Sequence, residues 1–257
     1  MSRPARRAWA RRVLPLLLLL LGLAAGPRPA AAQELVADLS SHLIAITTGF
    51  TGTSVVLFGA IEGPGDVVII VRGPSTDVAV RRKARIAGLW VNRDRITFGN
   101  VPSFYAVASS RPLDAIGPPE LLDLHEVGFD HLKLATLETD VDPADVPFFR
   151  RALIREKERQ GLFAPEVGKV SFLGNRLFRT TFGFPANVPT GNYLVEVLLV
   201  RDRAVASAQT TPLFISKLGV GASIFDFAHQ QGPLYGVVAI LAALMAGWLA
   251  HLAFRRA

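Results

Sequence analysis

The sequence predicts a mainly β protein: an immunoglobulin-like β-sandwich with a helical insertion, followed by a single C-terminal transmembrane helix. Three observations lead to this prediction. Short β-branched runs separated by Gly and Pro fill most of residues 33–217. A helical texture interrupts these runs at about residues 114–161. An apolar stretch occupies residues 234–254 and is long enough to cross a bilayer.

Strands are expected in the first half at residues 43–48, 54–62, 66–72, 77–86, 90–98 and 105–109. The sequence Gly63-Pro64-Gly65 predicts a hairpin turn between the second and third of these strands. In residues 77–86 the side chains alternate, so that Val78, Val80, Arg82, Ala84 and Ile86 share one face of the strand. This alternation predicts one face toward a core and one toward water.

The other face of that strand carries Arg81, Lys83 and Arg85, a candidate anion-binding or partner-binding face, with Arg93 and Arg95 nearby. Alternate residues of a strand project about 6.6 Å apart, so one oxyanion or lipid headgroup can bridge two of these side chains. The alternative is a solvated strand face, or charge that protects a sheet edge from further pairing.

Two helices are expected next, at residues 120–132 and 143–160. The second has clear end signals, with Asp142 as N-cap, Pro143 at the first position and Gly161 as the stop. Strands return at residues 170–173, 178–184, 193–200 and 205–215. The string PTGNY at residues 189–193 is typical of the corner before the penultimate strand of immunoglobulin-like domains, where a tyrosine ties the turn to the sheet.

Within the first helical segment, five side chains are candidate metal ligands: Asp123, His125, Glu126, Asp130 and His131. On a continuous helix Glu126 and Asp130 stand one turn apart on one face, whereas Asp123 and His125 point apart. The alternative is a solvated acidic face. The chain has no cysteine, so thiolate metal sites and thiol catalysis are excluded. No cofactor is expected.

The net charge of +7 at pH 7 arises at the two ends of the chain. Six arginines and no acidic residue precede Gln33, and two arginines follow Phe254. Of the 28 Lys and Arg, the remaining 20 lie between these ends, together with all 21 Asp and Glu. Basic residues placed in this way set membrane topology, and they do not favour a nucleic-acid partner.

Residues 1–32 predict a secretory signal peptide, because an arginine-rich start is followed by a leucine-rich run at 13–25 and by three alanines at 30–32. Cleavage is expected after the last alanine. Two alternatives stay open. The pair Arg11 and Arg12 can direct twin-arginine export, and an uncleaved segment would serve as a second membrane anchor.

The apolar segment 234–254 predicts the membrane span, since His251 is its only side chain that can carry a charge near neutral pH and a helix of this length covers about 31 Å. Arginines in the tail 255–257 follow it directly, and the linker 218–233 has no basic cluster. The tail is therefore expected in the cytoplasm and the domain 33–217 in the periplasm, on a bacterial inner membrane.

Small residues recur every four positions along the span, at Ala239, Ala243 and Gly247. Such a stripe lets a second helix approach closely, so self-association or contact with an integral-membrane transporter is expected along it. The alternative is a plain anchor, because alanine fits any span.

Four strings carry a resemblance to a known family: RRKARIAGLWVN at 81–92, VPSFYAVASSR at 101–111, ALIR with QGL at 152–162, and PTGNY at 189–193. Over residues 34–254 the chain resembles an alphaproteobacterial family of transmembrane proteins without an assigned biochemical function. The resemblance implies a membrane setting beside sulfite-exporter-like permeases of the TauE/SafE type. It carries over no catalytic residues.

The function expected from these observations is a membrane-anchored periplasmic binding or assembly module, accessory to an integral-membrane partner such as an anion permease. No nucleophile elbow, phosphate-binding loop or metalloprotease string occurs, so enzyme activity is not expected. Two alternatives stay open. One is an envelope enzyme or metal-dependent sensor that uses the segment 123–131, and the other is a structural envelope protein.

Overall fold

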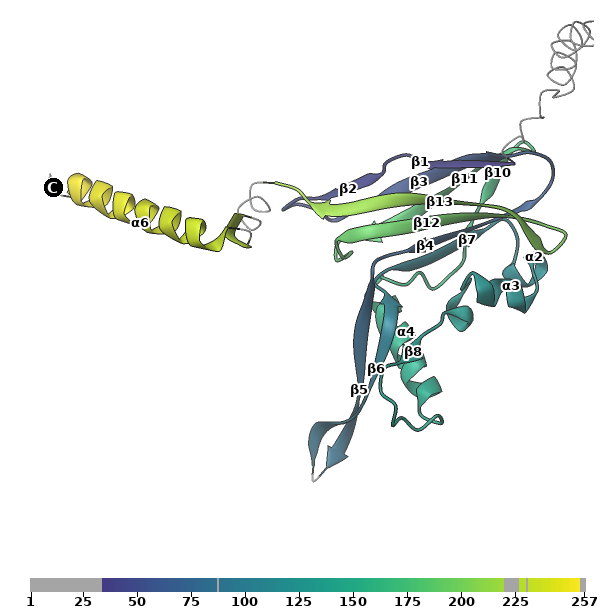
Figure 1. Ribbon diagram of the computed structural model, residues 1–257, viewed down its shortest axis with the longest axis horizontal. Coiled ribbons are helices and arrows are strands. Elements are labelled where there is room, and N and C mark those ends of the chain that lie inside the picture. The colour runs from purple at the N-terminus through teal and green to yellow at the C-terminus, as the bar shows by residue number, and fades with distance from the viewer. Residues whose placement is uncertain (1–33, 87, 220–226, 230, 255–257) are drawn as a thin grey trace, which may run out of the picture. The chain divides into compact units, whose positions relative to one another are not determined.

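The computed structural model describes the chain except for residues 1–33, 87, 220–226, 230 and 255–257. The expected signal peptide and the tail arginines lie outside the described residues. The described strands form three sheets, and a long helix, α6 (Gly232–Phe254), follows them in the chain (Figure 1). The prediction of a mainly β protein with a C-terminal apolar helix is confirmed.

Two of the sheets form the sandwich. Sheet A contains, in hydrogen-bonded order, β1 (Leu35–Leu39), β3 (Gly52–Ile61), β11 (Leu177–Pro185) and β10 (Ser171–Leu173). Sheet B contains β2 (Leu43–Ile46), β13 (Ala204–Lys217), β12 (Gly191–Arg201), β4 (Asp66–Arg72), β7 (Tyr105–Ser109) and β9 (Gly168–Lys169). Sheet A has the strand order of the A-B-E-D sheet of immunoglobulin domains, and β13, β12 and β4 have that of G, F and C. The immunoglobulin-like prediction is confirmed.

Alternating side chains hold the two sheets together. On β1, Leu35, Ala37 and Leu39 are buried and the residues between them are exposed. The ring of Phe184 on β11 meets the ring of Tyr193 on β12 edge-on, with 6.1 Å between the centroids. Each large apolar side chain buried in this way contributes about 1.5–3 kcal/mol.

Strand β4 is apolar on both faces, since every residue of Val67, Val68, Ile69, Ile70 and Val71 is buried. One face lies in the sandwich core. The other is covered by the helical insertion, which contains α2 (Leu113–Ile116), α3 (Pro119–Leu124), the 3-10 turn η1 (Phe129–His131) and α4 (Val146–Arg159) (Figure 1). Its buried residues, among them Ile116, Leu121, Leu122 and Val127, belong to the same apolar core. Sheet B therefore lies between two layers.

The predicted hairpin at Gly63-Pro64-Gly65 is wrong. Strand β3 pairs with β1 and β11 in sheet A, whereas β4 pairs with β12 and β7 in sheet B. The turn thus carries the chain from one sheet to the other. The physical reason is β4 itself, because a strand that is apolar on both faces has to lie inside a covered sheet. Arg201 secures the turn by donating to the carbonyl oxygens of Pro64, at 2.9 Å, and of Glu62.

Both predicted helices differ in extent from the observed ones. The helix expected at 120–132 ends at Leu124, because Glu126 (φ +51°) and Gly128 (φ +96°) have left-handed backbone conformations that a helix cannot continue. The helix expected from Pro143 begins at Val146, because the Asp142 carboxylate accepts a hydrogen bond from the Ala144 amide and forms a turn ahead of the helix. Its predicted stop at Gly161 (φ +71°) is confirmed.

The third sheet is a long antiparallel ribbon of β5 (Ser75–Ile86) and β6 (Leu89–Pro102), joined by the short β8 (Ala135–Thr136) (Figure 1). We call β5 and β6 the arm. The arm follows β4, and the segment toward α6 follows β13. Both β4 and β13 are antiparallel to β12, so they end at the same end of sheet B. The arm and the segment toward α6 therefore leave the sandwich from one end.

Helix α6 agrees with the predicted span. Its part Gly232–His251 is apolar and long enough to cross a membrane, and it is the one helix among the described residues with this property. Large apolar side chains such as Leu244 and Trp248 are exposed on it. Exposure of these apolar side chains to water would be unfavourable, whereas in a bilayer they contact hydrocarbon.

Candidate functional site

The arm presents two different faces. On β5 the side chains of Val78, Val80, Arg82 and Ala84 are partly buried, and those of Arg81, Lys83 and Arg85 are exposed. The alternation predicted from the sequence is present. Strand β6 contributes to the exposed face, because its register places Arg95 opposite Arg81, Asn92 opposite Lys83 and Trp90 opposite Arg85.

We call Arg81, Lys83, Arg85 and Arg95 the basic face. Side chains directly opposite each other in an antiparallel pair have their Cβ atoms about 4.5–5.5 Å apart, so Arg81 and Arg95 repel each other. Arg81 and Lys83 form no ion pair with any acidic residue in the described part of the chain. Arg95 interacts electrostatically with Glu138, and Arg85 donates to the Gly88 carbonyl. The basic face is thus left with charge that an anionic group can neutralise.

Arg82, on the opposite face, is fully engaged. Its guanidinium donates to Asp94 at 2.7 Å and to Asp145 at 3.3 Å. It also lies over the rings of Phe148 and Phe149 on α4, at 5.8 and 5.7 Å from the ring centroids. These contacts hold the arm against α4. Arg82 therefore has a structural role, and the basic face is the side of the arm that is left for binding.

The tip of the arm is apolar and exposed. Leu89 and Trp90 follow Gly88, whose φ of +84° makes the turn, and their exposed fractions are 71% and 68%. Trp and Arg are the residue types that most often dominate the energetics of protein interfaces. Trp90 lies opposite Arg85 at this end of the arm. The tip is therefore a candidate contact surface.

The five candidate metal ligands do not converge. His125 Nδ1 lies 3.0 Å from Glu196 Oε1 on sheet B, whereas His131 Nδ1 lies 2.6 Å from Asp123 Oδ1. Glu126 is in the left-handed turn, so the expected helical alignment of Glu126 with Asp130 is absent. In the described ranges no three His, Asp or Glu side chains form a group that could hold a metal ion. Three of the five candidates are thus divided between two separate pairs, and Glu126 and Asp130 belong to neither.

Glu196 and two other residues, none of them singled out from the sequence, fasten the segment 125–128 to sheet B. Arg72 donates to Glu196 at 2.8 Å and to the His125 carbonyl. The Tyr105 hydroxyl donates to the Glu126 carbonyl at 2.6 Å and accepts from the Gly128 amide at 2.7 Å. Burial raises the pKa of Tyr105 to about 12. No local signal could have shown this arrangement, because His125 and Glu196 are 71 positions apart.

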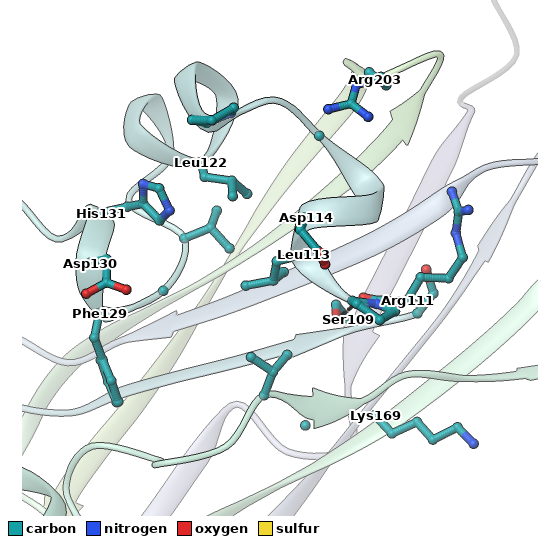
Figure 2. A pocket seen from close by; sticks show the side chains of 18 residues that line it. Ser109, Arg111, Leu113, Asp114, Leu122, Phe129, Asp130, His131, Lys169 and Arg203 are labelled. Carbon is teal, nitrogen blue, oxygen red and sulfur yellow. Dashed lines mark hydrogen bonds between the residues drawn. The ribbon is translucent and has the colours of Figure 1, made fainter.

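A cavity of about 900 Å³ lies between the helical insertion and the ends of β7 and β9, and it was not predicted from the sequence (Figure 2). Apolar side chains such as Leu113, Leu122 and Phe129 line it. Its charged residues are Arg111, Asp114, Asp130, His131, Lys169 and Arg203. Nearly all of these are exposed to solvent. Ser109 is a buried polar side chain in the lining, and its hydroxyl donates to the Arg111 carbonyl. The cavity thus differs from typical ligand sites, in which several buried polar groups converge.

The small residues of the predicted stripe are all on α6, where positions four apart share a face of a helix. Ala239 and Ala243 are exposed, and Gly247 has open space around the position that a Cβ atom would take. The described part of the chain leaves this face of the helix uncovered.

Residues 34–256 match the model of a protein family described as "Putative transmembrane protein (Alph_Pro_TM)". A search of the curated proteins finds no match for the chain. The family match covers the sandwich, the arm and α6, and it confirms the resemblance that the four strings indicated. The chain therefore belongs to this family of transmembrane proteins.

Proposed function

We propose that this chain is a membrane-anchored periplasmic interaction module that binds an integral-membrane partner through the basic face of its arm. The observation that carries this proposal is the pairing of Arg81 with Arg95 on an exposed face. Two like charges directly opposite each other lower the stability of the free protein. An anionic or acidic partner surface attracts both side chains and offsets their mutual repulsion, which favours the bound state.

The basic residues at the two ends of the chain support the proposed membrane topology. Arginines in the tail and at the start favour a cytoplasmic C-terminus and a domain exported to the periplasm of the inner membrane. The arm leaves the sandwich from the end where β13 continues toward α6. An anion permease of the sulfite-exporter type is the partner class that the family resemblance suggests. An alkaline phosphatase fused after Ala257 is expected to be inactive, and an active fusion would exclude this topology.

The tip of the arm favours a second candidate, the anionic bilayer surface. Trp90 is of a type that sits at the level of lipid headgroups, and basic side chains near anionic lipids each contribute about 1 kcal/mol. The test of the proposed function therefore has to separate a protein partner from lipid.

In this test, full-length protein is purified in mild detergent and co-purified proteins are identified by mass. The variant Arg81→Glu with Lys83→Glu and Arg85→Glu is expected to lose a membrane protein that the wild type retains. A control with the same charge change on exposed sites of the sandwich is Lys169→Glu with Arg176→Glu and Arg203→Glu. The control should retain the partner.

The second part of this test measures binding of the same proteins to vesicles of phosphatidylglycerol or of phosphatidylcholine. If the variant with Arg81, Lys83 and Arg85 changed to Glu, here called the arm variant, retains its co-purified proteins and loses its preference for phosphatidylglycerol, the ligand is lipid. If the arm variant and the wild type behave alike with proteins and with vesicles, the basic face has no role in binding.

We propose the stripe of Ala239, Ala243 and Gly247 as a second contact, made inside the membrane. Gly247→Ile keeps the helix apolar and blocks close approach, whereas Leu241→Ile changes a residue outside the stripe. Crosslinking of the full-length protein to its partner should decrease for Gly247→Ile and stay at the wild-type level for Leu241→Ile. Equal crosslinking for both variants means that α6 is only an anchor.

A further inference from the structure

The outer face of sheet A carries exposed apolar residues on all four strands. Val36, Ala60, Leu177 and Leu173 form one row across β1, β3, β11 and β10. Val36, Leu177 and Leu173 are each about half exposed, at 50%, 55% and 50%. A shallow hollow of about 370 Å³ lies over this row and is lined almost entirely by apolar side chains. The corresponding face of sheet B is covered at β4 by the helical insertion, and that of sheet A stays uncovered in the described part of the chain.

The next row carries one charged residue on each side of β3. Phe58 on β3 has Asp38 of β1 as its neighbour on one side and Arg179 of β11 on the other. Phe58 is 47% exposed, and both charged residues are exposed too. Neighbouring strands are about 4.8 Å apart, so the acid and the base lie about 10 Å apart with the ring between them. Asp38 uses Oδ1 for His42 at 2.8 Å, and Arg179 forms no ion pair with any described residue.

We infer that this face binds a second copy of the same chain, sheet against sheet, about a two-fold axis that runs along β3 within the interface. Rotation about this axis exchanges the two sides of β3. Phe58 then meets Phe58 of the other copy, Asp38 meets Arg179, and Val36 meets Leu177. Each ion pair forms twice, as an isologous interface requires.

The charges favour a second copy over other occupants. A ligand or lipid of one charge sign would place like charges against either Asp38 or Arg179. A second copy satisfies both, and it buries the apolar row at the same time. This inference does not depend on the proposed function, because the arm and sheet A are separate surfaces.

The first experiment uses the absence of cysteine in the natural chain. Full-length Phe58→Cys, treated in membranes with a short bismaleimide crosslinker, is expected to give a covalent dimer, because position 58 lies on the axis. Sheets that pack face to face lie about 10 Å apart, which a short crosslinker spans more readily than a disulfide. Leu194→Cys is the control, since Leu194 is exposed on sheet B at 53%. Crosslinking that is equal at both positions overturns the inference. Adding Gly247→Ile should leave the Phe58→Cys dimer unchanged, which separates this contact from one made through α6.

The second experiment exchanges the charges. Asp38→Arg and Arg179→Asp are each expected to weaken self-association of the full-length protein about tenfold or more, because each creates two repulsive pairs. When the two variants are co-expressed, the introduced arginine of one chain faces the introduced aspartate of the other, and both ion pairs of the mixed dimer are attractive. Two affinity tags detect this mixed dimer. If mixing does not restore association, the inferred axis is wrong, and this outcome leaves the arm proposal standing.

Discussion

The hydroxyl of Tyr193 donates a hydrogen bond to the carbonyl oxygen of Pro189 at 2.7 Å. The ring is buried between the sheets, where it meets Phe104 and Phe184. The bond closes the turn that leads into β12, and Gly191 (φ +143°) lets this turn pass close to Pro74, whose Cγ lies 2.8 Å from where a Cβ at Gly191 would be. This is the tyrosine corner that the string at 189–193 predicted.

Substitutions at this corner should separate the hydrogen bond from the ring. Tyr193→Phe is expected to lower the free energy of unfolding of the fragment 34–217 by about 1 kcal/mol. Tyr193→Ala removes the buried ring as well, and the loss should reach about 2–4 kcal/mol. Urea denaturation followed by circular dichroism measures both. Equal midpoints for the wild type and Tyr193→Ala would contradict a role for this corner in stability.

Tyr105→Phe should loosen the segment 125–128 without disturbing β7. The substitution leaves the Glu126 carbonyl and the Gly128 amide without their partner, at a cost of about 1–3 kcal/mol. Hydrogen exchange should become faster at the Gly128 amide. Exchange at Ala106, within the paired β7, serves as the internal control. Unchanged exchange at Gly128 means that Arg72 and Glu196 hold the segment by themselves.

Asp66 makes the free energy of unfolding depend on pH in the acid range. The hydrogen bond from Arg111, which is stronger than the opposing effect of burial, lowers the pKa of Asp66, with Ser110 adding a further bond. A pKa that is lower in the folded state means that the unfolded chain binds more protons near pH 4, so stability rises with pH there. The contribution is present above the unfolded pKa of about 4 and is lost as the pH falls through the folded pKa.

The test compares the wild type with Asp66→Asn by urea denaturation between pH 7 and pH 2.5. The variant should be the less stable protein at pH 7, and the difference should shrink steadily below pH 4. A difference that stays constant over this range would show that Asp66 acts through neutral hydrogen bonds alone.

The two faces of β5 should respond differently to the same substitution. Arg82→Ala removes two ion pairs and the contact with Phe148 and Phe149, so hydrogen exchange in β5 and α4 should become faster. Arg81→Ala relieves the repulsion with Arg95 and should leave exchange unchanged or slower. Partner binding should show the opposite order, with Arg81→Ala the more damaging change. Identical exchange in both variants would argue against the division of the arm into a structural face and a binding face.

The sequence by itself determined the features that depend on near neighbours. The alternation on β5, the extent of β4, the stop at Gly161 and the corner at Tyr193 are each set by residues only a few positions apart. The apolar character of α6 is likewise a property of one continuous stretch. Strand period, turn chemistry and span length are local quantities, and they can be read before the fold is known.

Only the tertiary structure decided which surfaces and partners these elements meet. It placed β3 and β4 in different sheets, paired His125 with Glu196, and aligned Asp38, Phe58 and Arg179 in one row. The partners in each case are far apart in the chain, and the strand pattern alone is compatible with several pairings. The burial of apolar surface on both faces of β4 favours the observed pairing, because this arrangement covers that strand on both sides.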